Sequence, residues 1–480
     1  MKIQIGIGSM DMEEIATLCG GQLVGTGTAE AICTDSREAT DEKTLFWVTV
    51  GERVDAHAYM KRAYDGGCRL FLCHRIPEEL AGCDICAVVV ADTVAAMGSL
   101  AKGYTARLTR PTVGVTGSVG KTTTKELISA VLSERFTVHK TKANHNSTIG
   151  LPMSMLEATD AHTLSVVEMG MSGFGEIDFM SRIAEPWVAC ITNIGSSHLE
   201  LLGTRENICR AKLEIVNGMR EDGVVILNGD EPLLRRMCPA NVKTQFITLD
   251  GAEADIQVSN IVYDDKGTCF DIKIDGVCHR GIRLSVIGRP FVWAAAFAIA
   301  VARRFDMDMD TIRRGLSHFE NAAMRQSITT YGGITFIEDC YNASPESVRA
   351  AIDVMQTLAN QSGARMTALL GDMRELGEGS TDFHRSVGAY YVQKGGEMLF
   401  TVGSLAENIA KGAADAGLNP DSIVSMSEYE TDEAVAAMGE RVCGALRKGD
   451  ILLVKASRAI GAERILAYVK QKLFEQTKGQ

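Results

Sequence analysis

A glycine-rich loop followed by a lysine and three threonines is the part of the chain best suited to chemistry. Residues 111–125 read Pro-Thr-Val-Gly-Val-Thr-Gly-Ser-Val-Gly-Lys-Thr-Thr-Thr-Lys. The apolar start predicts the end of a buried strand, and the spacing of apolar residues after Lys121 predicts a helix. A strand, a glycine loop and a helix N-terminus direct free N–H groups and the positive end of a helix dipole towards one place, which suits an anion.

In such a loop, Lys121 supplies a positive charge for the β- and γ-phosphates of a nucleotide, and the Thr122 hydroxyl is a ligand for Mg²⁺. The match to the phosphate-loop signature is incomplete, because Val115 stands where the first glycine is expected. The alternative is an ordinary glycine turn. We favour phosphate binding because Gly-Lys-Thr opens a helix directly after an apolar strand. The expected nucleotide contacts in this segment are Thr116, Gly117, Ser118, Val119, Gly120, Lys121, Thr122 and Thr123.

Polar side chains also follow two further apolar stretches. Residues 164–167 lead into Glu168, and residues 188–192 lead into Asn193 and His198. Ligands of parallel α/β sheets bind at the carboxyl ends of strands, so we expect Glu168 and His198 on the side of the phosphate loop. Glu168 is then a candidate Mg²⁺ ligand. The alternatives are a solvated strand end for Glu168 and a capping or otherwise satisfied histidine for His198.

The composition fits a multidomain globular protein of the cytoplasm. A length of 480 residues suggests about three domains, and the net charge of −12 argues against general nucleic-acid binding. No signal peptide is visible at the start, and the apolar stretch at residues 291–302 is too short to span a bilayer. The 13 cysteines show no disulfide framework, and Cys83-x-x-Cys86 lacks the second pair that a zinc site needs.

We expect an α/β fold in three parts. Residues 1–108 predict a small N-terminal α/β domain, residues 109–318 a central phosphate-loop domain with a mostly parallel sheet, and residues 319–480 a C-terminal, doubly wound Rossmann-like domain. Pro111 suits the first boundary, because the residue before a proline is pushed out of helix. In the last part, strands end in polar clusters that a doubly wound sheet would gather at one edge.

Taken together, these segments resemble the Mur ligases of peptidoglycan synthesis over nearly the whole chain. The features shared with the family are Thr116-Gly-Ser-Val-Gly-Lys-Thr122, Glu168-Met-Gly170, Thr192-Asn-Ile-Gly195 with His198, and Ala211-Lys212-Leu-Glu214. Other segments resemble the members that add D-alanyl-D-alanine to a UDP-N-acetylmuramoyl-tripeptide. They are Asp35-Ser-Arg37, Asn144-His-Asn146-Ser-Thr-Ile-Gly-Leu-Pro152, Asp339-Cys-Tyr-Asn-Ala-Ser-Pro345, Leu370-Gly-Asp-Met-Arg-Glu-Leu-Gly377 with His384, and Val454-Lys-Ala-Ser-Arg458.

The resemblance implies ATP-dependent amide formation through an acyl phosphate. The tripeptide carboxylate is phosphorylated by ATP, and the amine of D-alanyl-D-alanine then displaces the phosphate. The resemblance also implies two Mg²⁺ ions and four catalytic residues, Lys121, Glu168, His198 and Lys212. Lys212 is implied to be carbamylated, and with Thr122, Glu168 and His198 it completes the metal ligands. From the residues alone, Lys212 is more simply an ordinary solvated lysine.

The resemblance assigns further residues to the substrates. Those implied at the nucleotide are Asn193, Arg325, Asp339, Tyr341 and Asn342. Those implied at the other substrates are Asp35, Ser36, Arg37 and His57 near the uridine diphosphate, with Asn146, Lys455 and Arg458. The expected partners are these small molecules alone, with no nucleic acid and no membrane insertion, and the chain is expected to be a monomer.

One segment departs from the family pattern. Members usually carry His-Asn after the glycine that corresponds to Gly288, and another Asn three residues later, near the adenine. This chain has Pro290, Phe291 and Ala294 at those positions. Because these side chains cannot make amide contacts, how adenine is recognised stays open.

Three other functions stay open at this point. The chain fits another amide ligase of the same superfamily, such as one that adds a single amino acid or glutamate to folate, but residues 370–377 argue against this. A phosphate-loop switch or motor would hydrolyse nucleotide without an acceptor, and it gives Lys212 and the N-terminal part no role. A nucleotide-binding relative that has lost catalysis is the third.

Overall fold

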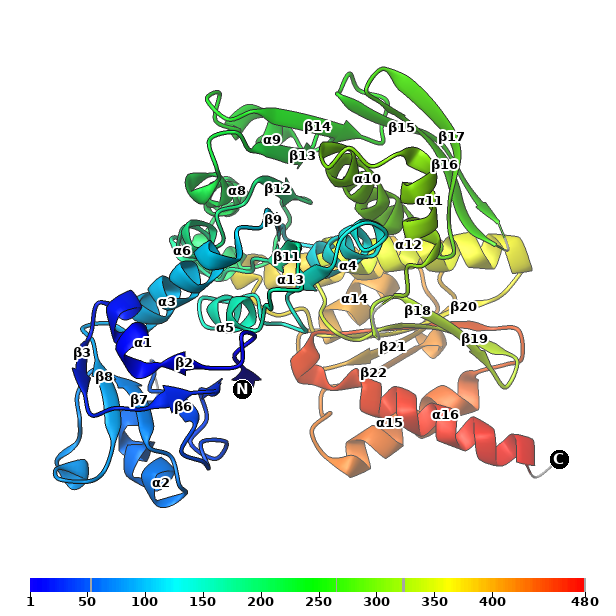
Figure 1. The fold of residues 1–480 in the computed structure, drawn as a ribbon. Coiled ribbons are helices and arrows are strands. Elements are labelled where there is room, and N and C mark those ends of the chain that lie inside the picture. The colour runs from blue at the N-terminus through cyan, green and yellow to red at the C-terminus, as the bar shows by residue number, and fades with distance from the viewer. Residues whose placement is uncertain (52–53, 265, 322–323, 479–480) are drawn as a thin grey trace.

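The computed structural model describes residues 1–51, 54–264, 266–321 and 324–478, and within them the chain forms three large β-sheets (Figure 1). Each large sheet comes from one stretch of the sequence, which matches the expected order of three α/β parts. The expected α/β class is therefore confirmed. The limits at residues 108 and 318 stay a prediction.

The N-terminal sheet has six strands in the order β1-β5-β6-β7-β8-β3. Its four inner strands are parallel and the two edge strands are antiparallel. The inner strands are almost wholly apolar, because helices cover both faces of a parallel sheet. The strands are β1 (Lys2–Gln4), β3 (Gln22–Val24), β5 (Ala31–Cys33), β6 (Thr44–Trp47), β7 (Leu70–Cys73) and β8 (Cys86–Val89), and the helices are α1 (Met12–Cys19), α2 (Met60–Asp65) and α3 (Thr93–Leu108). A small ribbon pairs β2 (Met10–Asp11) with β4 (Thr28–Ala29).

The central sheet has nine strands in the order β10-β11-β9-β12-β13-β14-β15-β16-β17. All pairs up to β15 are parallel, and the last two pairs are antiparallel. The strands are β9 (Thr112–Thr116), β10 (Val138–Lys140), β11 (Leu164–Glu168), β12 (Val188–Ile191), β13 (Val224–Asn228), β14 (Thr244–Thr248), β15 (Ile256–Asp264), β16 (Gly267–Ile274) and β17 (Val277–Leu284). The helices are α4 (Lys121–Leu132), α5 (Gly150–Leu156), α6 (Glu176–Ala184), α7 (Leu199–Leu202), α8 (Arg205–Leu213), α9 (Pro232–Met237), α10 (Arg289–Arg304) and α11 (Met309–Ser317).

The C-terminal sheet has six strands in the order β18-β19-β23-β20-β21-β22, parallel except for the β18–β19 pair. Its strand order doubles back at β23, as a doubly wound sheet requires. The strands are β18 (Ser327–Tyr331), β19 (Ile334–Asp339), β20 (Met366–Gly371), β21 (Met398–Val402), β22 (Ile423–Met426) and β23 (Ile451–Lys455). The helices are α12 (Pro345–Ser362), α13 (Ser380–Gln393), α14 (Glu407–Asp415), α15 (Asp432–Ala445) and α16 (Ala462–Lys478).

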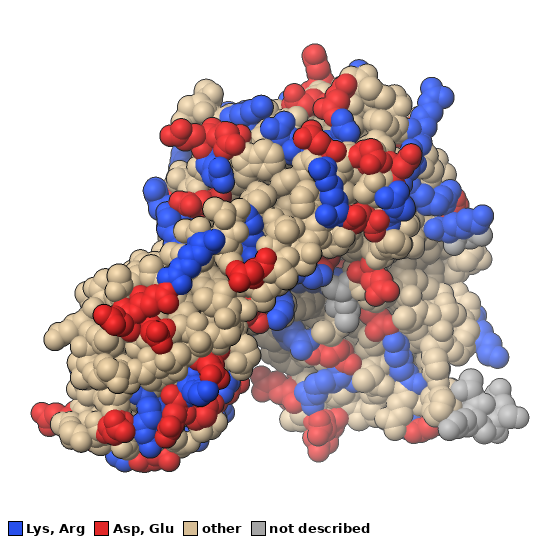
Figure 2. Space-filling model, in the orientation of Figure 1, with Lys and Arg blue, Asp and Glu red and all other residues tan. Residues whose placement is uncertain are grey.

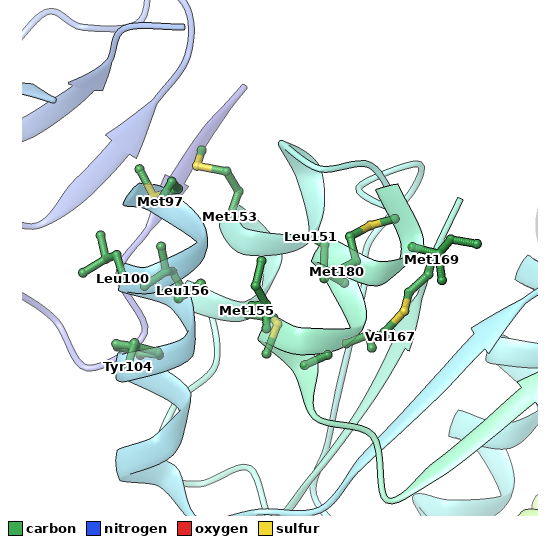
Figure 3. Close-up of a cluster of buried hydrophobic side chains, with 14 of the residues drawn as sticks. Met97, Leu100, Tyr104, Leu151, Met153, Met155, Leu156, Val167, Met169 and Met180 are labelled. Atoms are coloured by element: carbon green, nitrogen blue, oxygen red, sulfur yellow. The ribbon is translucent and has the colours of Figure 1, made fainter. Parts of the chain in front are cut away.

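An apolar core runs without interruption from the N-terminal part into the central part. Figure 3 shows helix α3, with Met97, Leu100 and Tyr104, facing Met155 and Leu156 of α5. All five side chains are buried. Methionine is unbranched and flexible, so it fills the irregular space between helices of two different sheets. The N-terminal part is therefore packed against the central part as one body, rather than tethered by a linker.

The first loop of the chain makes this contact very close. The Gly6 N–H donates a hydrogen bond of 2.8 Å to the Leu156 carbonyl oxygen. A Cβ atom added to Gly6 would lie 2.1 Å from the Ala158 carbonyl oxygen, which belongs to the backbone and cannot swing away. Only glycine fits this position.

We therefore predict that Gly6→Ala destabilises the protein by about 1–3 kcal/mol, the usual cost of overpacking. Urea denaturation followed by circular dichroism measures this. The control is Gly444→Ala in α15, where an added Cβ meets no atom within 4 Å. That control should be neutral or stabilising by up to about 1 kcal/mol, because alanine favours helix. Equal stability of wild type and Gly6→Ala would contradict the proposed close contact.

Three further observations concern the surface, the helices and the cysteines. Figure 2 shows acidic and basic side chains interspersed on this face, and a hollow between the N-terminal and C-terminal parts. Across the described ranges, no helix is long and apolar enough to cross a membrane. All 13 cysteines are free, and the described residues hold no group of three His, Cys, Asp or Glu that suits a metal, so Cys83 and Cys86 are two separate thiols.

Candidate active site

The glycine loop lies between β9 and α4, as expected. Gly117 has a φ of 149°, and a Cβ there would lie 1.9 Å from the Thr192 hydroxyl oxygen. Gly120 has a φ of 83° and is the residue from which α4 starts. Both positions favour glycine, because other residues rarely adopt these φ values and Gly117 has no room for a side chain. The loop therefore delivers the N-terminus of α4 to the end of β9.

The Lys121 side chain folds back over this loop. Its Nζ donates hydrogen bonds to the carbonyl oxygens of Gly117 at 2.7 Å and Ser118 at 3.3 Å. Burial lowers the pKa of the ammonium, Glu168 opposes this effect and Arg325 adds to it. The lysine charge is thus held at the mouth of the loop by backbone oxygens.

A cavity of about 360 Å³ lies in front of the loop, between the central and C-terminal parts. Most of the residues expected at the nucleotide and the metal line it, together with two of those expected at the other substrates, Asn146 and Lys455. These are Ser118, Val119, Gly120, Lys121, Thr122, Thr123, Asn146, Glu168, His198, Arg325, Asp339, Tyr341, Asn342 and Lys455. The structure therefore brings together side chains that are spread over more than 300 positions of the sequence, which is the grouping expected at the carboxyl edges of two doubly wound sheets.

Glu168 ends β11 and forms the floor of this cavity. The Thr122 hydroxyl donates to its Oε2 at 2.8 Å, and the Asn146 amide donates to its Oε1 at 2.8 Å. The carboxylate is only 2% exposed, so the alternative of a solvated strand end is wrong. Its hydrogen-bond partners are neutral, which leaves a buried negative charge beside a hydroxyl oxygen. This pair of oxygen donors fits Mg²⁺, which needs few protein ligands because it keeps waters and phosphate oxygens.

His198 also lines the cavity, at the start of α7. Its Nδ1 lies 2.6 Å from a carboxylate oxygen of Glu375, which belongs to the C-terminal part. The His198 side chain makes no capping bond to α7, so the capping alternative is wrong, but the contact with Glu375 fits the alternative of a satisfied histidine. The role of His198 as a metal ligand stays a prediction.

Lys212 differs from what its sequence context suggests. It lies on α8 with its side chain 2% exposed, so the interpretation as a solvated lysine is wrong. Burial, with the Lys121 charge as a smaller contribution, lowers the pKa of Lys212 well below its usual value. No hydrogen-bond or ion-pair partner for its Nζ is found among the described residues. Lys212 does not line the cavity.

Two other residues near the loop support its shape instead of lining the cavity. The Thr116 hydroxyl donates to the Met169 carbonyl oxygen at 2.7 Å. The Asn193 Oδ1 accepts the N–H groups of Ser118 at 3.1 Å and Val119 at 2.9 Å. Both residues stabilise the loop through these hydrogen bonds. Their contact with nucleotide stays a prediction.

The C-terminal wall of the cavity is built from charged and aromatic side chains. Lys455 ends β23 and its Nζ donates to Asp339 Oδ2 at 2.6 Å and to the Asn342 carbonyl oxygen at 2.9 Å. The Arg325 guanidinium lies 4.0 Å from the centre of the Tyr341 ring, a cation–π contact. These contacts join five of the expected residues in two groups: Lys455 with Asp339 and Asn342, and Arg325 with Tyr341.

Arg458 lies outside this group. Its guanidinium donates to the Glu463 carboxylate at 2.9 Å, and it does not line the cavity. Its expected contact with substrate stays a prediction.

The residues expected at the uridine diphosphate lie in the N-terminal part, away from this cavity. Arg37 donates to Asp35 at 2.6 Å, next to Ser36. His57 is buried: its Nδ1 lies 2.5 Å from Asp55 Oδ1, and its Nε2 accepts the His74 N–H at 3.1 Å. Both ring nitrogens are therefore occupied, and the role of all four residues at the substrate stays a prediction.

Sequence reasoning missed several residues of the cavity. Ser172 and Glu176 follow the carboxyl end of β11, and Gln326 precedes β18. Glu176 accepts hydrogen bonds from the N–H groups of Ser172 at 3.2 Å and Gly173 at 3.0 Å. The signal available was their place after a parallel strand, which is where ligands bind.

Comparison with known proteins agrees with this geometry. The family described as Mur ligase middle domain matches residues 115–302, and the Mur ligase, glutamate ligase domain matches residues 324–458. A curated protein of Bacillus subtilis, UDP-N-acetylmuramoyl-tripeptide–D-alanyl-D-alanine ligase, is 39% identical over 441 residues, which are 91% of this chain and 92% of that protein. This chain belongs to the Mur ligase family. The Escherichia coli protein of the same name is 28% identical to this Mur ligase, over 96% of the chain and 99% of that protein.

Solved structures extend the likeness to the whole fold. A MurF structure from Acinetobacter baumannii covers 97% of this Mur ligase and all of its own chain, with a TM-score of 0.87 and 26% identity. A MurF ligase structure from Thermotoga maritima in complex with ADP has a TM-score of 0.81 and 27% identity, over 93% of this chain and 98% of that one. The three-part α/β arrangement is thus that of the family.

Proposed function

We propose that this chain joins D-alanyl-D-alanine to UDP-N-acetylmuramoyl-tripeptide, using ATP and releasing ADP and phosphate. The observation that carries the proposal is the single cavity in which the phosphate loop, the buried Glu168 and the Lys455–Asp339 pair meet. The Bacillus subtilis relative of that name, matched over 91% of this chain, supports the choice of substrates. We also propose a cytoplasmic location, since ATP is available there and the free thiols suit a reducing compartment.

The chain's own residues suit phosphoryl transfer. The loop N–H groups, the N-terminus of α4 and Lys121 bind and neutralise the phosphates, which is most of what such a transfer needs. A carboxylate oxygen of the tripeptide attacks the γ-phosphorus, the bond to ADP breaks, and an acyl phosphate forms. The amine of D-alanyl-D-alanine then attacks the acyl carbon, loses a proton, and displaces phosphate. A cavity closed by the C-terminal part excludes water from this intermediate.

We include Mg²⁺ in the proposal as a cofactor. Thr122 and Glu168 would hold one ion, since their two oxygens are already 2.8 Å apart, and His198 is proposed at a second ion. The ion's chemistry is to neutralise phosphate charge. Thr122 opens α4, so its hydroxyl lies beside the N–H groups that bind phosphate.

The proposal also includes carbamylation of Lys212. A neutral amine adds to the carbon of CO₂ and releases a proton, which leaves an anionic carbamate. The lysine must first lose its own proton, and burial together with the Lys121 charge favours that loss by lowering the pKa of Lys212. A carbamate converts a cation that cannot bind metal into an oxygen ligand. Nζ has no hydrogen-bond or ion-pair partner among the described residues, which leaves the amine free to react.

Release of phosphate and formation of the peptide, measured together, test the proposed function. Both should appear only when ATP, the UDP-linked tripeptide and D-alanyl-D-alanine are all present. Phosphate release without either acceptor substrate would instead indicate a switch or motor. Nucleotide binding without turnover would indicate a relative that has lost catalysis, and turnover with a single amino acid would indicate another ligase of the family.

A separate prediction concerns the base of the nucleotide. Pro290 and Phe291 line the cavity at the start of α10, and Phe291 is 3% exposed and packs against Phe319 with ring centres 6.2 Å apart. Proline has no N–H and phenylalanine no polar group, so this segment offers only apolar contact. An amide pairing with adenine is worth about 1–3 kcal/mol of discrimination in nucleic-acid readers. We therefore predict weaker discrimination of ATP from GTP than in relatives that carry asparagine here.

The measurement is kcat/KM for both nucleotides, in the wild type and in a triple variant, Pro290→His, Phe291→Asn and Ala294→Asn. The variant should gain preference for ATP, about tenfold if it restores one amide pairing. Strong rejection of GTP by the wild type, with no gain in the variant, would mean that another loop reads the base.

A further inference from the structure

One loop of the central part touches both the phosphate loop and the C-terminal part. We name residues 192–198, which connect β12 to α7, the junction loop. On one side it holds the phosphate loop: the Thr192 hydroxyl donates to the Val119 carbonyl oxygen at 2.6 Å, and the Gly195 N–H donates to Ser118 Oγ at 2.9 Å. The Asn193 Oδ1 accepts two further bonds, and the Asn193 carbonyl oxygen accepts the Ser118 N–H at 3.2 Å, so five hydrogen bonds join the junction loop to Ser118 and Val119.

On its other side, two carboxylates of the C-terminal part hold the junction loop. The Ser196 hydroxyl donates to Glu346 Oε1 at 2.7 Å. Glu375 approaches His198 at 2.6 Å, and its carbonyl oxygen accepts the Glu200 N–H at 3.4 Å. The same short loop is therefore fixed by the nucleotide-binding loop on one side and by the domain that must close over it on the other.

Glu346 lies at a helix terminus, but one of its carboxylate oxygens is buried. It lies in the first turn of α12, after the N-cap Ser344 and Pro345, where the helix dipole favours a negative charge. Its Oε2 is buried and has no hydrogen-bond partner in the described part of the chain. A Cβ added to Gly195 would lie 3.2 Å from this oxygen, so the carboxylate lies directly against the junction loop. A surface helix-capping role does not require such burial.

We propose that Glu346 is a positioning residue for phosphoryl transfer, which through Ser196 fixes the junction loop, and so the phosphate loop, when the C-terminal domain closes. The bond from Ser196 is charge-assisted, which makes it short and strong. Open domains would separate the two groups, because they belong to different sheets. Closure would then do more than exclude water: it would hold Ser118 and Val119 in one arrangement, which lowers the reorganisation needed in the transition state. The inference rests on the proposed function for its kinetic readout.

Four variants and one control test the proposal. The variants are Glu346→Ala, Ser196→Ala and the double variant, and Glu346→Gln retains an acceptor for the Ser196 hydroxyl. The control is Glu433→Ala, because Glu433 holds the equivalent place in the first turn of α15, two residues after the N-cap Thr431, and is exposed. Each is compared with the wild type by kcat, by KM for the UDP-linked tripeptide and by thermal unfolding.

We expect Glu346→Ala and Ser196→Ala each to lower kcat at saturating ATP about tenfold or more, the usual cost of losing a hydrogen bond to a charge. KM for the tripeptide should stay unchanged, and the double variant should be no worse than the poorer single variant, because both lose the same contact. Glu346→Gln should recover part of kcat, and Glu433→Ala should match the wild type. Unchanged kcat in both single variants, or losses that multiply in the double variant, would overturn the proposal.

Hydrogen exchange provides a readout that does not depend on ligation. With Mg²⁺ and a non-hydrolysable ATP analogue, a peptide covering residues 117–120 should exchange faster in Glu346→Ala and Ser196→Ala than in the wild type or in Glu433→Ala. A residue that only caps α12 would change exchange in its own helix alone, and that result would contradict the proposal. If the wild type forms no peptide but the exchange pattern appears, the proposed substrates are wrong and the positioning role stands. If Glu346→Ala fails to fold, kcat and hydrogen exchange of Ser196→Ala test the proposal instead.

Discussion

Replacement of Lys121 by alanine should abolish both ATP turnover and peptide formation, with a loss of about 10³-fold or more in kcat. The Lys121 ammonium lies in the cavity and is held by the carbonyl oxygens of Gly117 and Ser118. Groups that neutralise a transferring phosphoryl group in this way contribute about 10³- to 10⁵-fold to the rate, because the charge is already in place when the bond breaks. Alanine removes the charge and leaves the loop glycines untouched.

The matched control is Lys140→Ala, which removes a lysine of the same central part. The Lys140 side chain is 45% exposed, pairs with Glu126 and does not line the cavity. Both variants are assayed for phosphate release and for the ligated product, and both are checked by thermal unfolding. A purified, folded Lys121→Ala variant that ligates near the wild-type kcat would remove the phosphate loop from the mechanism.

Lys212→Ala should lose at least about 100-fold in kcat, the scale expected when a charge-stabilising group of the transition state is removed. Part of the loss should return when a short carboxylic acid such as acetate is added, because its oxygens replace those of the carbamate. Lys121→Ala provides the control, since an added acid cannot replace a missing cation.

The proposed carbamate also has a direct spectroscopic signature. With ¹³CO₂, the wild type should show a carbamate resonance that is absent in Lys212→Ala. This modification needs a neutral amine, so the signal should weaken as the pH falls below the lowered pKa of Lys212, where the amine takes up a proton. A missing resonance together with no rescue would show that Lys212 acts as a plain lysine.

Local signals in the sequence located the centre of the site. The phosphate loop, β11 with Glu168 and the N-cap at Ser344 all depend on residues within one turn or one strand of each other. Such signals survive in any tertiary context, because glycine conformation, capping and strand ends are set by neighbouring residues. The resemblance to Mur ligases supplied most other residues of the cavity.

The contacts between the central and C-terminal parts could not be predicted in this way. Ser196 and Glu346 are 150 residues apart, and each looks like an ordinary loop or helix-start residue. Whether they meet depends on how the central and C-terminal sheets pack together. The spacing of apolar residues along the sequence does not predict that packing. His57 shows the reverse case: a polar loop residue that suggested a ligand contact has both ring nitrogens satisfied inside its own part of the fold. Lys212 shows that a helix pattern alone does not tell a buried lysine from a solvated one.

The methionine-rich seam between the N-terminal and central parts also has a redox consequence. Met97, Met153 and Met180 are fully buried there. Peroxide converts a methionine thioether into a polar sulfoxide, which does not suit an apolar core. These sulfurs are shielded only while the two parts stay packed together. The rate at which dilute peroxide oxidises these methionines therefore measures how often the two parts separate. Each sulfoxide formed would hinder the two parts from packing together again.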